Sequence, residues 1–157
     1  MKIAAIALAA AAAASTLAVG VSVSAQDFTQ RPTYGAVNLR TGYTPDPHVR
    51  QIQSGGPVNA QRLGNNCVGM IANAPDYRVN FQAGQLPLTI SATSQTDTTL
   101  VINGPDGRWY CNDDANGVNP SVTFRAPRSG QYDIWVGTYG STNNAATRLA
   151  ISEIGQR

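Results

Sequence analysis

Apolar and polar residues alternate along short segments of the chain from about residue 67 onward. The segment YRVNF places Tyr77, Val79 and Phe81 on one face, and QYDIWVGTY alternates in the same way. This period of two, with β-branched and aromatic residues on one side, is typical of β-strands. No window of residues 26–157 keeps a helical period. The chain must therefore bury its apolar surface with sheets.

Turn-forming sequences separate the alternating segments. GPDG predicts a tight turn, because Pro105 fixes φ at the second turn position and Asp106 and Gly107 accept the remaining angles. It predicts a hairpin between strands near 100–103 and 108–111. The whole pattern predicts an all-β fold: an antiparallel two-sheet β-sandwich, jelly-roll-like, of about eight strands. The segments expected to form strands are CVGMIA, YRVNF, LPLTISA, TLVING, RWYC, SVTFRA, QYDIWVGTY and RLAISEI.

Residues 26–57 differ in composition from the rest, with four prolines and four glycines. Such a stretch cannot hold a long helix. AVNLR and VRQIQ can each form a short edge strand, and the remainder is expected to be extended along the domain or partly disordered. We therefore expect an irregular N-terminal arm at 26–57 and a β-sandwich domain at 58–157.

The first 25 residues have the layout of a secretory signal peptide. A lysine precedes an apolar, alanine-rich run, and the first acid is Asp27. Cleavage is expected after Ala25. A membrane-spanning helix needs about 20 strongly apolar residues, and this run is shorter and less apolar. We therefore expect no stable membrane span after cleavage. The predicted location is the periplasm or the cell exterior.

Charge and cysteine content narrow the possible partners. Beyond Lys2 the basic residues are arginines, scattered along the chain and nearly balanced by acids, which predicts no nucleic-acid partner. Cys67 and Cys111 are most simply explained as one disulfide, because exported proteins meet an oxidising environment. The alternative, two thiols or a thiolate metal site, lacks the paired spacing of zinc sites.

Residues 97–139 carry an ordered set of motifs. Asp97 and a threonine precede a strand, then come a glycine turn, NDD at 112–114, Ser121 and the pattern SGQYDIWV. This order resembles the bacterial pre-peptidase C-terminal domain, a β-sandwich often appended to secreted proteases. The upstream segment APDYRVNFQAGQLPLTI is similar to a segment that lies nearer the N-terminus in the sequences of that family.

The resemblance implies a non-catalytic accessory domain, and here a stand-alone version, since only the predicted signal peptide and arm lie upstream. Calcium-binding members carry two alternating aspartates in the upstream segment. Asp76 matches one of them, but Ala74 stands where the other would be.

The NDD loop offers hard oxygen ligands of the kind that calcium takes. The candidate ligands are Asp97, Asn112, Asp113 and Asp114. The EF-hand spacing is absent, because no glutamate follows at the required offset. The alternative is that these side chains accept backbone N–H groups and shape a turn. Both interpretations are open at this point.

Four aromatic residues in or beside strands are candidate ligand-binding residues: Trp109, Tyr110, Trp135 and Tyr139. Alternation places Trp135 on the face opposite its apolar neighbours in the strand. If that face is exposed, Trp135 could stack on a sugar or meet a protein partner at the cell envelope. Alternatively, the arm covers it, or it fills a second side of the sheet.

Catalytic residues are not expected. His48, the single histidine, lies in the proline-rich arm and is interpreted as an exposed loop imidazole. No GxSxG or HExxH motif is present. The predicted function is a non-catalytic exported binding or structural module. The alternatives are a calcium-assisted carbohydrate- or protein-binding domain and, below it, a peptidase-associated hydrolase accessory protein.

Overall fold

A computed structural model of the protein describes residues 26–64 and 66–155, so the predicted signal peptide lies outside the described residues. The structure is built from strands and one 3-10 turn, which confirms the all-β prediction. Each of the segments predicted as strands overlaps one of β4 to β11. The elements are β1 (Ala36–Arg40), β2 (His48–Ser54), β3 (Val58–Asn59), η1 (Ala60–Leu63), β4 (Met70–Ile71), β5 (Tyr77–Gln82), β6 (Leu88–Thr93), β7 (Thr98–Asn103), β8 (Trp109–Asn112), β9 (Ser121–Phe124), β10 (Gly130–Thr138) and β11 (Ala145–Ser152).

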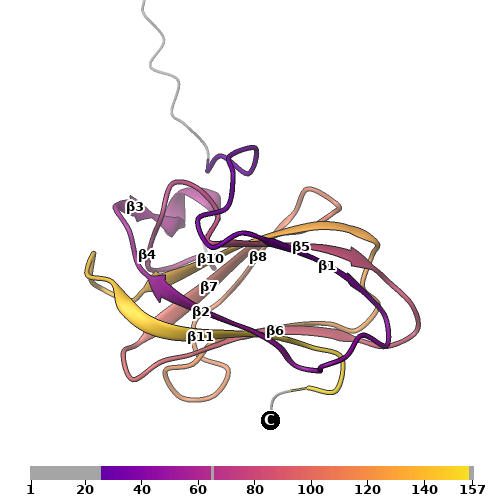
Figure 1. Ribbon diagram of the computed structural model, residues 1–157. Helices are drawn as coiled ribbons and strands as arrows, with labels where there is room; N and C mark the ends of the chain where they lie inside the picture. The colour runs from indigo at the N-terminus through magenta and orange to yellow at the C-terminus, as the bar shows by residue number, and fades with distance from the viewer. Residues whose placement is uncertain (1–25, 65, 156–157) are drawn as a thin grey trace, which may run out of the picture.

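The strands form two sheets that face each other, as the ribbon in Figure 1 shows, and this confirms the two-sheet sandwich. The four-stranded sheet has the order β2-β11-β6-β9. In the seven-stranded sheet, β10 is central: β7 lies along one edge, and β5 and β4 share the other. Strands β7 and β8 form the predicted hairpin, and Gly107 N donates to Gly104 O at 2.9 Å in its turn.

The segment at 26–57 is part of the sandwich and is not an irregular arm. Both suggested edge strands are present, β1 at the edge of the seven-stranded sheet and β2 at the edge of the four-stranded one. Val37 and Leu39 of β1 pack on the core, and Ile52 of β2 is buried. Alternation therefore continues into this proline-rich stretch. With β1, β2 and β3 the described strands number eleven, and β1 pairs with β5 in parallel, which departs from a purely antiparallel sandwich.

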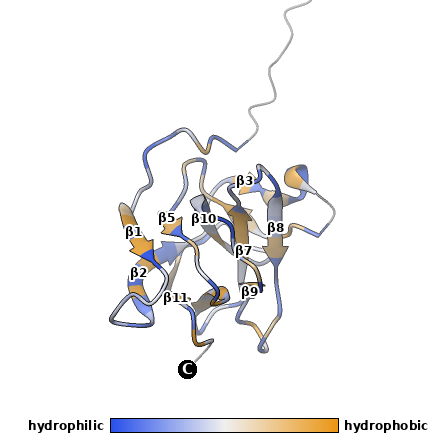
Figure 2. Cartoon of the chain, turned by 90° about the vertical axis from the view of Figure 1, so that its right-hand side faces the viewer, coloured by the Kyte–Doolittle hydropathy of each residue, from blue (hydrophilic) through white to orange (hydrophobic). Residues whose placement is uncertain are grey.

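Two apolar cores lie on opposite faces of the seven-stranded sheet. The main core fills the space between the sheets and includes Val79, Ile134 and Leu149, all fully buried. The second core lies on the outer face and gathers Trp135 with residues of the 58–72 segment. Figure 2 shows orange, hydrophobic stretches on strands such as β1 and β7. Within residues 26–64 and 66–155, no helix has the length and apolar character that a membrane crossing demands.

Candidate functional site

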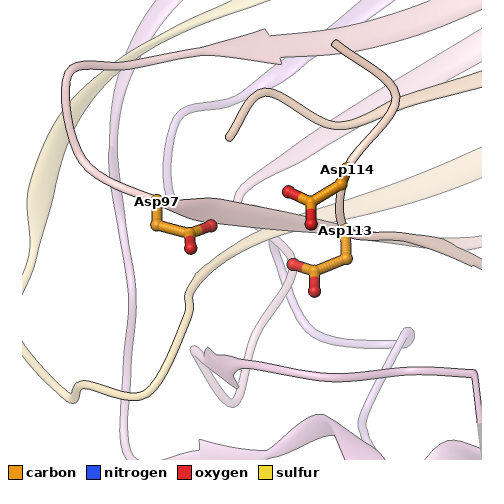
Figure 3. Close-up of side chains that lie close together, drawn as sticks. All are labelled: Asp97, Asp113 and Asp114. Atoms are coloured by element: carbon orange, nitrogen blue, oxygen red, sulfur yellow. The ribbon is translucent and has the colours of Figure 1, made fainter. Parts of the chain in front are cut away.

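Three carboxylates meet at one end of the β7–β8 hairpin. Asp97 directly precedes β7, while Asp113 and Asp114 directly follow β8. The two strands are antiparallel neighbours, so the start of β7 lies beside the end of β8. One oxygen from each of the three acids lies within 4.8 Å of the others, and the carboxylates point toward one another in Figure 3.

The surroundings of this cluster disfavour its negative charge. The Oδ1 atoms of Asp97 and Asp113 are inaccessible to solvent and have no hydrogen-bond partner in the described part of the chain. Burial and the nearby Asp114 raise the pKa of Asp97. Burial, Asp114 and Asp97 raise the pKa of Asp113. A cation would relieve both the repulsion and the missing hydrogen bonds.

Asn112 has a structural role that differs from that of the three acids. Its Oδ1 accepts a hydrogen bond from Ser121 N at 2.8 Å, which attaches the end of β8 to the start of β9. The turn interpretation therefore accounts for Asn112. It leaves the buried Oδ1 atoms of Asp97 and Asp113 unexplained, and three carboxylates remain as the candidate metal ligands.

Asp76, which matches an aspartate of calcium-binding members of the resembled family, lies outside this cluster. Its side chain is buried, and its Oδ2 accepts a hydrogen bond from Val136 N at 2.7 Å. Burial raises the pKa of Asp76 to about 7. In the described structure Asp76 thus fastens β10 to the residues before β5.

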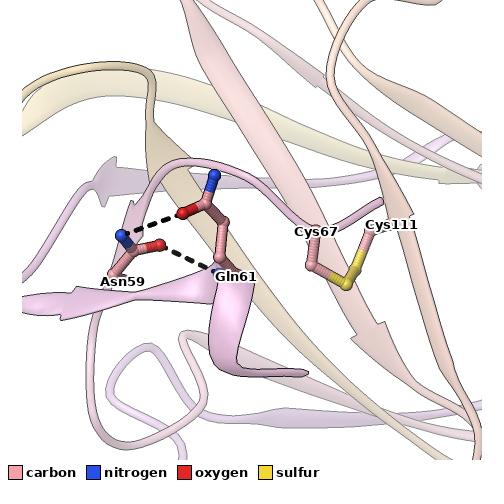
Figure 4. Close-up of a disulfide and its surroundings, with 4 residues drawn as sticks. All are labelled: Asn59, Gln61, Cys67 and Cys111. Carbon is pink, nitrogen blue, oxygen red and sulfur yellow. Dashed lines mark hydrogen bonds between the residues drawn. A yellow bond between two sulfur atoms is a disulfide. The ribbon is translucent and has the colours of Figure 1, made fainter. Parts of the chain in front are cut away.

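The predicted disulfide between Cys67 and Cys111 is present (Figure 4). It attaches the segment between η1 and β4 to β8, two residues before Asp113. Next to it, Asn59 Oδ1 accepts from Gln61 N at 2.9 Å and so caps η1. The segment 58–72 is therefore fixed on the outer face of the seven-stranded sheet.

Of the two interpretations of Trp135, the structure excludes the exposed one. Its side chain is fully buried and lies 5.4 Å from Trp109, centroid to centroid. Trp135 packs in a second core on the outer face of the sheet, which was one of the alternatives. The segment 58–72 covers it there, and the N-terminal arm does not. Alternation correctly gave the face of Trp135, and it could not show that a non-periodic segment folds back over that face.

The remaining aromatic candidates do not share one surface. Tyr110 packs against the main core, and its hydroxyl donates to Asp106 Oδ2 at 2.6 Å. Trp109 is half-buried beside Trp135 in the second core. Tyr139 follows β10 and is 51% exposed. Of the four, Tyr139 is the residue best placed to contact a ligand.

His48 begins strand β2 and is not in an exposed loop. Its ring is partly buried and stacks on Tyr77, and its Nε2 lies 3.0 Å from the Tyr77 hydroxyl. Burial and the nearby Arg50 lower the pKa of His48. Across residues 26–64 and 66–155, no hydrogen bond joins His48 to a serine or to a carboxylate, and such bonds define a catalytic triad.

Sequence reasoning missed a groove of about 420 Å³ beside Tyr139. One wall consists of Asn59, Gln61 and residues 68–70, and the other is the loop 139–142 after β10. These two segments are far apart in the sequence, so no local pattern could place them together. Tyr139 was the single signal, as an aromatic residue at the end of an otherwise buried strand.

No family model matches the chain, and no curated protein matches it. Among solved structures, it is similar to the pre-peptidase C-terminal domain of a collagenase from Bacillus anthracis, with 13% identity and a TM-score of 0.48 over 78% of this chain and 98% of that one. It is also similar to PliG of Aeromonas hydrophila, a periplasmic inhibitor of g-type lysozyme, with 13% identity and a TM-score of 0.39 over 74% of this chain and 96% of that one. The first of these structures is a domain of the family that residues 97–139 resemble.

Proposed function

We propose that the protein is a non-catalytic exported binding module whose acidic cluster holds a calcium ion. One observation carries the metal proposal: among the described residues, the Oδ1 atoms of Asp97 and Asp113 are inaccessible to solvent, have no hydrogen-bond partner and lie close to a third acid, Asp114. Buried carboxylates without partners are costly unless a cation compensates them. Three clustered acids with raised pKa values at two of them fit such a site.

Calcium is the cation that this donor set fits best. Calcium takes six to eight oxygen ligands in flexible geometry, and three carboxylates with water can supply them. Zinc sites are dominated by thiolate and imidazole ligands, which this cluster lacks. Magnesium requires a stricter octahedron and keeps most of its water. The residues that would hold the ion are Asp97, Asp113 and Asp114.

The disulfide supports the exported location, because disulfides persist in oxidising compartments. The proposed partners are a glycan or a protein at the cell envelope. In this scheme the ion ties the start of β7 to the end of β8 and so orders the loops that carry exposed side chains.

The test is thermal unfolding of the purified protein in chelator and then in added calcium. Because calcium binds the folded state, the melting temperature should rise by several degrees. Asp97→Asn with Asp113→Asn should remove this response. The same variant should melt above the wild type in chelator, since it removes repulsion between partly buried carboxylates.

Asp106→Asn is the matched control, because Asp106 lies in the turn of the same hairpin and outside the cluster. This variant should keep the full calcium response. Equal melting temperatures of the wild type in chelator and in calcium would refute the metal site.

A further inference from the structure

The groove beside Tyr139 is formed by two segments that the sandwich holds in place. On one side, Ala60 N donates to Gly69 O at 3.0 Å, and Met70 pairs with Thr138 of β10. The disulfide at Cys67 fastens the same segment to β8. The volume of the groove, about 420 Å³, lies within the range of small-molecule sites, roughly 300–1,000 Å³.

The lining of the groove is uncharged and mixed: amide and hydroxyl side chains lie beside the apolar Val68 and Met70. None of the residues that line it is an acid or a base. Tyr139 offers an aromatic ring that is 51% exposed. Amide and hydroxyl groups surround it: those of Asn59, Gln61, Ser141 and Thr142.

The two amides of the groove are partly fixed before any ligand arrives. Asn59 Oδ1 accepts from Gln61 N, and Asn59 Nδ2 lies 3.4 Å from Gln61 Oε1. In Figure 4 the Gln61 Nε2 atom points away from this pair, so it can donate to a ligand. A preorganised amide loses little conformational entropy on binding.

We infer that this groove binds a neutral oligosaccharide. A pyranose ring has an apolar C–H face that packs on an aromatic ring and a hydroxyl edge that exchanges hydrogen bonds with amides and hydroxyls. An anionic or cationic ligand would find no opposite charge in the lining. An apolar peptide side chain could cover Val68 and Met70, but it would leave the amides and hydroxyls of the groove without partners.

The groove is connected to the proposed calcium site through the backbone. Tyr139 N donates to Asp97 O at 3.0 Å, and Asp97 supplies one carboxylate of the cluster. An ion that holds Asp97 therefore also holds the backbone that carries the Tyr139 ring. This link rests on the proposed calcium function, whereas the sugar site itself does not.

The experiment is an NMR titration of the purified protein with uncharged hexasaccharides of β-1,4-linked glucose, β-1,4-linked N-acetylglucosamine and α-1,4-linked glucose. A charged hexamer of galacturonic acid is tested beside them. At least one neutral hexamer should shift the amide signals of Gln61 and Tyr139 saturably, with a Kd of about 1 mM or tighter. Tyr139→Ala should weaken this binding at least tenfold, and Tyr139→Phe should retain it.

Phe28→Ala is the matched control, since Phe28 is another exposed aromatic residue and lies outside the groove. The sugar site is overturned if no neutral hexamer shifts groove signals at about 10 mM, if galacturonic acid binds more tightly, or if Tyr139→Ala binds like the wild type. Repeating the titration in chelator separates the two proposals. Sugar binding that is the same in chelator and in calcium would support the sugar site and refute its link to the calcium site. A calcium-dependent melting temperature without sugar binding would support the calcium site and refute the sugar site.

Discussion

Asp76 shows how a single buried acid can set the pH response of the protein. Its carboxylate is buried and receives one backbone hydrogen bond, from Val136 N. Burial outweighs that bond and raises the pKa of Asp76 to about 7. An unfolded chain would keep the aspartate near its ordinary pKa of about 3.9. The folded protein therefore holds this proton more tightly than the unfolded one.

The sign of the stability effect follows from this difference. The stabilising contribution of protonated Asp76 is complete below about pH 4 and is lost as the pH rises through about 7. Asp76→Asn does not titrate and can still accept from Val136 N. The free energy of unfolding of the wild type, relative to this variant, should therefore fall by a few kcal/mol between pH 4 and pH 8, as measured by urea denaturation.

Asp106→Asn is the control, because the contribution of Asp106 has the opposite pH dependence and stays nearly constant above its unfolded pKa. A hydrogen bond from Tyr110 lowers the pKa of Asp106, so its stabilising contribution is present above the unfolded pKa and is lost as the pH falls. A constant difference between the wild type and Asp76→Asn over this pH range would contradict the argument for Asp76.

At the scale of elements, β10 is the strand on which the outer layer rests. Gly137 of β10 lies where β4 and β7 both approach closely. A Cβ atom on Gly137 would lie 2.9 Å from Ile71 Cγ2 and closer still to Thr99 Oγ1. The absence of a side chain at this position lets side chains and backbone of β4 and β7, which flank β10 on opposite edges, approach it closely.

Gly137→Ala should consequently destabilise the protein by about 1–3 kcal/mol, the usual cost of overpacking. Thr99→Ala removes the nearest clashing oxygen, so the double variant should recover part of the loss beyond simple addition. Urea denaturation of the two single variants and the double variant measures this coupling. Strict additivity of the two changes would show that Thr99 does not limit the approach.

The strands were largely predictable from the sequence, and their arrangement was not. Alternation located β4 to β11, and the GPDG turn located the β7–β8 hairpin, because both signals are local. Parallel pairing of β1 with β5 joins segments about 40 residues apart, and no local pattern encodes it. The carboxylates of Asp97 and Asp113 were both named as ligands, but their meeting depends on the pairing of β7 with β8. Alternation assigned Trp135 to the correct face of the sheet. It could not show that the 58–72 segment, which has no periodic pattern, covers that face.

At the scale of the whole molecule, the protein has two cores, and only the second depends on the 58–72 segment. The main core lies between the sheets, and none of its buried residues comes from the 58–72 segment. The second core depends on that segment, which reaches the sheet through short strands and one disulfide. The groove beside Tyr139 uses the same segment as a wall. Loss of the disulfide should therefore affect the outer layer before the sandwich.

Cys67→Ser with Cys111→Ser tests this hierarchy. The bond closes a loop with a sequence separation of 44, so its removal should lower the free energy of unfolding by about 4 kcal/mol, because the unfolded chain regains entropy. Native-state hydrogen exchange should show the largest loss of protection at Ala60 and Ile71, while Val79 and Ile134 open in the global unfolding step. Equal protection at all four amides in the double variant would contradict the hierarchy, since it would mean that the outer layer and the sandwich unfold as one unit even without the covalent link.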